Sequence, residues 1–246
     1  MGLFSSHYFS NTHQVLVIIH VLSALLSIVV APLVMWVKKG GKVHRQWGKV
    51  YFWGMFVANM TAIVLLFYRF NIFLLGVTVL SFYGAITGYR VLYRKRPLSG
   101  SGPNWFDWAA AIVTLVMGLA LLGWGAWAAL GNRPFGLPAG GNVPIILIIF
   151  PIVFGLFIAS NAITDVRSFI QPATDKQWWW YYHMDRMLGS YIGLMTALMV
   201  QQVGPRLPQN IAWVVWILPA IIGSIAISRW INSYKQKFTA TTNSAV

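Results

Sequence analysis

Few side chains in this chain of 246 residues are able to do acid–base or metal chemistry. There are four acidic residues, all aspartate, five histidines and no cysteine. Two of the histidines, His44 and His183, each stand at the start of a predicted helix, on the same side of the protein and at similar depth. Neutral imidazoles in such positions ligate metals or haem iron, or transfer protons. His44 and His183 are therefore the predicted ligands of a cofactor, either haem b or a divalent metal.

Polar residues predicted to lie in the same layer could assist the two histidines. Asn161 and Asp165 are four residues apart and share one face of a helix. Asp165, Asp185 and Arg186 are the candidate catalytic groups, and Asp165 or Asp185 would orient a ligating histidine. The other candidates in this layer are Arg45, Arg90, Asp107 and Asn161. A second interpretation stays open, in which the aspartates only neutralise nearby arginines.

His20 lies deeper, inside the first apolar segment and on one stripe with His13 and Ser27. It could line a cavity or act as an axial haem ligand. No other predicted span has a histidine at that depth, so a hydrogen bond to a neighbouring helix is the preferred interpretation.

The composition indicates a protein that lies in a membrane. Only 9% of the residues are charged and 58% are hydrophobic, whereas a soluble domain has about 25% charged residues. The net charge of +14 reflects a shortage of acid. Lys and Arg occur in short clusters between apolar runs, a pattern that indicates contact with the lipid bilayer and its anionic head groups and not with nucleic acid. The absence of cysteine excludes disulfides, thiol catalysis and iron–sulfur clusters.

Seven segments are long enough to cross a bilayer, which takes roughly 20 apolar residues. We therefore predict an all-α fold, a single transmembrane helical domain over 1–246. The predicted spans are 14–37, 50–68, 71–92, 106–130, 143–165, 187–203 and 210–231.

The loop charges predict the orientation of these spans. Of the 18 Lys and Arg, all but Arg69, Arg133 and Arg206 fall on one side. The positive-inside rule then puts the N-terminus outside, the C-terminus in the cytoplasm and the protein in a bacterial inner (plasma) membrane, as a multi-pass protein. The stretch 131–142 is predicted to be an irregular outer loop, and the aromatic run 178–182 is predicted to lie among the head groups.

Other motifs narrow the classes of function. The last predicted span has no lysine for a retinal Schiff base, and the chain has neither an HExxH motif nor a phosphate-binding loop. Gly189 and Gly193 form a small-xxx-small pattern that favours close helix packing, within the bundle, in a homo-oligomer or in a larger complex.

Two local patterns resemble a family of bacterial polytopic membrane proteins of unknown function. The first is the stretch 44–51, with the form His-Arg-x-x-Gly-x-x-Tyr, and the second is 183–191, a histidine with a downstream Met and Ser-Tyr. The resemblance covers roughly residues 15–232, and Met184 stands where the family usually has arginine. The matching positions are His44, Arg45, Gly48, Tyr51, His183, Met187, Ser190 and Tyr191. The resemblance implies the location of a site but no activity.

The main functional hypothesis is a redox or electron-transfer component with a haem or metal, whose site lies at the cytoplasmic ends of the second, fifth and sixth spans. A quinone-like lipophilic ligand would approach the aromatic run 178–182. One alternative is a small-solute transporter or channel-like protein, since Pro32, Pro151 and Pro219 lie within predicted spans. Another is an accessory subunit of a larger membrane complex, docked through the sixth span.

Overall fold

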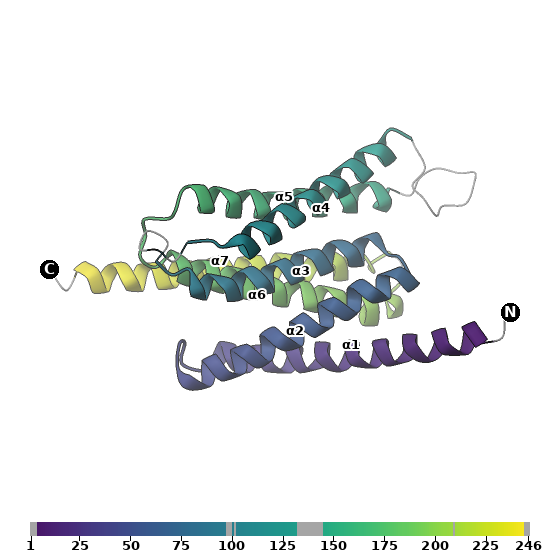
Figure 1. Ribbon diagram of the computed structural model, residues 1–246, viewed down its shortest axis with the longest axis horizontal. Coiled ribbons are helices and arrows are strands. Elements are labelled where there is room, and N and C mark those ends of the chain that lie inside the picture. The colour runs from purple at the N-terminus through teal and green to yellow at the C-terminus, as the bar shows by residue number, and fades with distance from the viewer. Residues whose placement is uncertain (1–3, 97–99, 101, 132–144, 209, 244–246) are drawn as a thin grey trace.

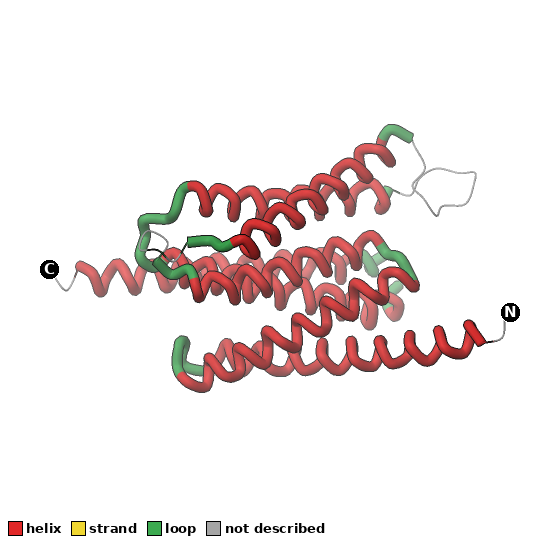
Figure 2. The backbone as a smooth tube through the Cα atoms, viewed as in Figure 1, coloured by secondary structure: helices red, strands yellow, loops and turns green. Residues whose placement is uncertain are grey.

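Seven α-helices make up most of the chain in the computed structural model, which describes residues 4–96, 100, 102–131, 145–208 and 210–243. A short 3₁₀ turn, Val91–Tyr93, extends α3, and a π-helix, Met199–Val203, followed by a 3₁₀ turn, Gly204–Arg206, extends α6. No strand occurs in these described ranges (Figure 2). The helices are α1 (Phe4–Trp36), α2 (Lys42–Tyr68), α3 (Ile72–Arg90), α4 (Trp105–Ala129), α5 (Ile146–Ile170), α6 (Trp178–Leu198) and α7 (Val214–Asn243).

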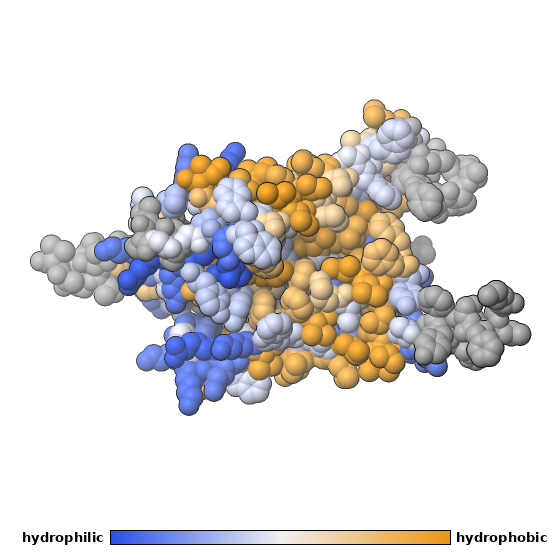
Figure 3. Space-filling model, viewed as in Figure 1, coloured by the Kyte–Doolittle hydropathy of each residue, from blue (hydrophilic) through white to orange (hydrophobic). Residues whose placement is uncertain are grey.

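Six of the seven helices are long and apolar enough to cross a membrane, all except α6. Hydrophobic residues cover the middle of the molecule, and hydrophilic residues gather over the end where α1 and α2 join (Figure 3). The prediction of an all-helical, multi-pass membrane protein is therefore confirmed, and six of the seven predicted spans are confirmed as apolar helices. α6 differs from the others because His183, Asp185 and Arg186 lie within its first nine residues.

The start of α6 differs from the prediction. The helix begins at Trp178 and not near residue 187, so that the aromatic run forms its first turn and His183 lies in its second turn. Trp180 packs on α7, with its ring centroid 4.4 Å from that of Tyr234 and 5.6 Å from that of Phe238. These contacts with α7 bury part of the aromatic run and explain why the helix extends so far towards its N-terminus.

Two other loop predictions have different outcomes. The second and third spans are separate helices, as predicted, because Asn71 caps α3 by accepting hydrogen bonds from the backbone N–H of Phe73 (3.0 Å) and Leu74 (3.1 Å). The predicted outer loop 131–142 lies outside the described residues apart from Gly131.

The helices form three groups, and α3 belongs to the central one. The α1–α2 and α4–α5 hairpins lie on opposite sides, with α3, α6 and α7 between them (Figure 1). α3 is the most enclosed of the six apolar helices, with 61% of its apolar window buried. Glycines allow this close packing: a Cβ on Gly84 would lie 3.0 Å from the carbonyl oxygen of Arg186 in α6. The predicted packing glycines of α6 differ from each other: a Cβ on Gly193 would lie 3.1 Å from the hydroxyl oxygen of Ser81 in α3, whereas a Cβ on Gly189 would meet nothing within 4 Å.

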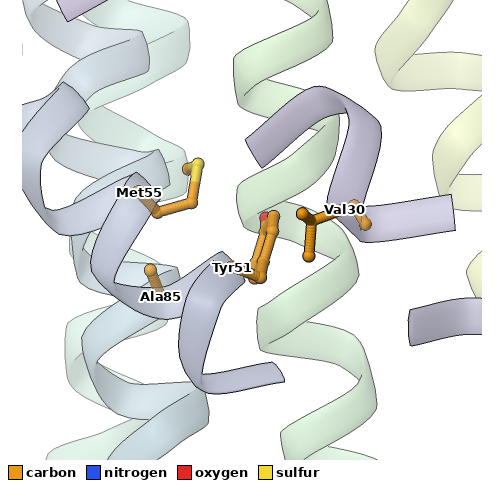
Figure 4. Close-up of a cluster of buried hydrophobic side chains, with 5 residues drawn as sticks. Val30, Tyr51, Met55 and Ala85 are labelled. Atoms are coloured by element: carbon orange, nitrogen blue, oxygen red, sulfur yellow. The ribbon is translucent and has the colours of Figure 1, made fainter. Parts of the chain in front are cut away.

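The core next to the histidines joins the first three helices to α6. Tyr51 of α2 lies beside Val30 of α1, and Ala31, Met55 and Ala85 complete the buried cluster (Figure 4). The Tyr51 hydroxyl shares a 2.8 Å hydrogen bond with the hydroxyl of Ser190 in α6. This buried polar link fixes the N-terminal half of α2 against α6.

Candidate functional site

His44 and His183 lie next to each other although they are far apart in the sequence. Their ring centroids are 6.5 Å apart, with ring planes at 73°. His44 is in the first turn of α2, and His183 is in the second turn of α6. Gly40, with a φ of +74°, makes the tight turn that returns the chain from α1 to α2. The structure thus brings together the two residues that the sequence singled out as ligands.

The Nδ1 atom of each imidazole is hydrogen-bonded to a backbone carbonyl oxygen. The Nδ1 atom of His44 lies 3.2 Å from the oxygen of Val34, and Nδ1 of His183 lies 2.7 Å from the oxygen of Gly88. A carbonyl oxygen only accepts hydrogen bonds, so Nδ1 carries the proton in both rings. In the neutral ring, Nε2 then holds the free lone pair. This is the tautomer that metal-binding histidines commonly have.

The orienting partners differ from the predicted ones. We expected Asp165 or Asp185 to hold a histidine, but carbonyl groups of α1 and α3 do so. Gly88 has a double role, because a Cβ there would lie 2.9 Å from Cβ of Arg186 and 3.0 Å from Sδ of Met187. Only glycine lets α6 come close enough for His183 to reach this carbonyl. Sequence reasoning missed Gly88, and nothing in its local pattern distinguishes it from other glycines.

The histidine pair lines a cavity of about 470 Å³, which we call the histidine cavity. It lies at one end of the bundle, between α1, α2, α6, α7 and the end of α3. No acidic side chain is among its lining residues. Six aromatic and four basic residues line it, namely Tyr51, Tyr89, Tyr93, Trp179, Trp180, Trp230, Lys39, Arg45, Lys49 and Lys95. The histidine cavity is therefore aromatic and cationic, and it suits an anionic or electron-rich ligand.

Asp165 and Arg186 form a separate, buried network. Asp165, fully buried, accepts hydrogen bonds from the hydroxyl groups of Tyr83 (2.5 Å) and Tyr182 (2.7 Å) and from Nη2 of Arg186 (2.8 Å). Arg186 also donates to the side-chain oxygen of Asn161. None of the acidic or amide groups in this network lines the histidine cavity. The geometry gives these candidate catalytic residues a structural role, which joins α3, α5 and α6.

Two other candidates among the aspartates also lie away from the histidine cavity. Asp107 accepts hydrogen bonds from Nε (3.1 Å) and Nη2 (2.9 Å) of Arg90, and it lies 3.8 Å from Nε of Arg94. It also forms a capping box with Asn104 at the start of α4. The side chain of Asp185 is exposed. Ion pairing and helix capping therefore account for Asp107.

His20 is held between helices, in line with the preferred interpretation of its position. Its Nδ1 atom lies 2.9 Å from the carbonyl oxygen of Ala58 and 3.2 Å from the hydroxyl of Thr61, both in α2. It does not line the histidine cavity.

A metal at the histidine pair would have few ligands from the protein. Within the described ranges, no group of three or more His, Cys, Asp or Glu residues is placed to hold a metal ion. Met184 and Met187 also line the histidine cavity, and their thioether sulfurs are soft ligands. The protein thus offers two imidazoles, with thioethers nearby.

Comparisons with known proteins add no relative. No family model, no curated protein and no solved structure matches the chain. The resemblance of the two histidine motifs to a family of unknown function therefore stays a prediction, and the site is interpreted from its own geometry.

Proposed function

We propose that this membrane protein holds a redox-active metal centre between His44 and His183 and acts as an electron-transfer component. The observation that supports this best is the pair of adjacent imidazoles whose Nδ1 atoms are both engaged by backbone carbonyls. Both rings are oriented without a carboxylate, and Nε2 of each ring is the atom that would bind the metal.

The spacing of the rings suits one metal between them. Metal–imidazole bonds are about 2.0–2.1 Å long. Two such bonds, with the distance from each nitrogen to its ring centre added, span about the 6.5 Å found here between the ring centroids, so His44 and His183 would both reach one metal ion. His44 and His183 would be the two protein ligands of a haem, and no group of three or more His, Cys, Asp or Glu residues stands together in the described chain. The aromatic walls would then contact the porphyrin, and the basic residues would balance its carboxylates.

A metal ion without a porphyrin is the other form of the same proposal. Met187 is four residues after His183 and shares its face of α6. Imidazole and thioether ligands together favour copper. Absorption spectra separate the two forms, because only haem gives a Soret band.

We further propose that α6, with its π-helical extension, is a seventh span, and that the histidine cavity faces the cytoplasm. α6 packs along the apolar helix α3, and the start of α1 and the end of α7 lie at opposite ends of the bundle (Figure 1). The basic residues around the histidine cavity favour the cytoplasmic side of a bacterial plasma membrane. A lipophilic quinone is the proposed electron partner, since Trp179 and Trp180 line the histidine cavity.

Purified protein in detergent provides the test. We expect about one haem or one metal ion per chain, by absorption spectroscopy and elemental analysis. His44→Ala and His183→Ala should each lose it while they keep the elution volume of the folded protein. His20→Ala is the matched control, because this histidine binds α2 and does not line the histidine cavity. Wild-type protein with neither a Soret band nor a stoichiometric metal contradicts the proposal, and so does equal loss in His20→Ala.

A further inference from the structure

An apolar cleft of about 350 Å³ runs between α6 and α7. Leu218, Ile222 and Ala226 of α7 line it and are exposed, so the cleft is open along its side. Across from them lie Ile192 and Met195 of α6. The cleft opens beside α7, which is apolar enough to cross a membrane, so hydrocarbon is the solvent that reaches it.

The cleft adjoins the histidine cavity. Met35, Leu188 and Trp230 line both spaces. The length of the cleft is close to one leaflet of a bilayer: from Leu218 to Trp230 the helix rises about 18 Å, and the hydrocarbon core is about 30 Å thick. An acyl chain in the cleft would therefore run from the middle of the membrane to its surface.

The end of the cleft at Trp230 is cationic. The Lys39 ammonium lies 5.2 Å from the centroid of the Trp230 ring. It donates hydrogen bonds to the carbonyl oxygens of Val34 (3.3 Å) and Met35. An ammonium has three donors, so one remains for an anionic oxygen. Arg45, like Lys39, lines the adjoining histidine cavity, and neither pairs with a carboxylate in the described part of the chain.

From this geometry we propose that the cleft binds one anionic glycerophospholipid. One acyl chain fills the space between α6 and α7, and the phosphate binds Lys39 at the Trp230 end. A neutral quinone has the tail for the cleft but leaves the cluster of positive charges uncompensated, so charge favours the phospholipid. This site goes beyond the redox role and does not depend on a metal at the histidine pair.

Native mass spectrometry tests the proposal on full-length protein released from nanodiscs of mixed phosphatidylcholine and phosphatidylglycerol. We expect one phosphatidylglycerol to stay bound in preference to phosphatidylcholine. Lys39→Gln keeps a donor for the α1 carbonyls but loses the charge, so the preference should fall about fivefold. Lys38→Gln is the matched control, since Lys38 is exposed and lines neither space.

A second pair of variants tests the acyl chain. Ala226→Phe fills the cleft and should abolish retention of lipid, whereas Ala220→Phe, at an exposed position outside the cleft, should not. His44→Ala should lose any metal and keep the lipid, so the two proposals fail separately. Equal retention of both lipids, preferential retention of an added neutral quinone, or equal loss in a variant and its control overturns the inference.

Discussion

Replacing Asp165 by Asn should destabilise the protein strongly. The change removes the negative charge that balances Arg186, and both side chains are buried, with exposures of 0% and 7%. It also replaces one acceptor oxygen by an NH₂ group, which must then face the hydroxyl of Tyr83 or Tyr182 or the guanidinium. The network therefore loses both charge balance and an acceptor.

The size of the effect follows from the burial of the pair. Removing one partner of a buried ion pair costs about 3–5 kcal/mol, because the other charge stays buried and unpaired. Asn keeps one oxygen that accepts from Arg186, so we expect the lower end, about 3 kcal/mol. Arg186→Met should cost a similar amount. The double variant should cost less than the sum, because no lone charge remains.

Equilibrium unfolding in mixed micelles, followed by tryptophan fluorescence, measures these differences. Asp185→Asn is the matched control, since Asp185 is exposed on the same helix as Arg186. It should change the free energy of unfolding by less than about 0.5 kcal/mol. The folded fraction of Asp165→Asn should still bind the metal, because Asp165 does not line the histidine cavity. If Asp165→Asn is as stable as Asp185→Asn, the network does not stabilise the fold and the reasoning is refuted.

Three further outcomes can be measured with the same material. Gly118→Ala should destabilise the protein by about 1–3 kcal/mol, because the new Cβ would lie 2.7 Å from a backbone nitrogen of α5. Gly123→Ala has open space around it and should stabilise the protein by up to about 1 kcal/mol. Equal effects of the two substitutions would contradict the packing of α4 on α5. Tyr51→Phe should lower the free energy of unfolding by about 1 kcal/mol, because it loses the hydrogen bond to Ser190. An unchanged unfolding midpoint would contradict this expected loss. Burial lowers the pKa of Lys39 below its ordinary value of 10.5. Retention of anionic lipid should therefore fall as the pH rises through this lowered pKa, where the amine loses its charge, and constant retention up to about pH 10.5 would contradict the role of Lys39.

Much of the architecture could be predicted because it depends on local composition. Apolar runs long enough to cross a bilayer predicted the helices, whereas the cap that Asn71 forms on α3 was found only in the structure. The start of α6 could not be predicted in this way. The run 178–182 is amphipathic, and its contacts with Tyr234 and Phe238 of α7 decide that it is helical.

The candidate site was predictable only in part. His44 and His183 stand out because polar, metal-binding side chains are rare in this chain, and their predicted depth already suggested that they meet. The role of Asp165 was predicted only in outline, as one of the aspartates that would neutralise an arginine, and its partners were not predictable. Its spacing from Asn161 shows a shared helix face, but the tyrosine donors come from α3 and α6.

The sequence by itself determined that the chain is helical, that it is built for a membrane and that its scarce ionisable groups gather in one layer. These properties follow from residue composition and from the period of the α-helix. The tertiary structure separates these ionisable groups into the histidine cavity and the buried network of Asp165 and Arg186. Helix packing at Gly88 brings His183 to a backbone carbonyl and to the cationic histidine cavity, while the burial of Arg186 commits Asp165 to neutralising it. A buried charge takes the nearest counter-charge that the packed helices provide, and sequence spacing does not reveal which one that is.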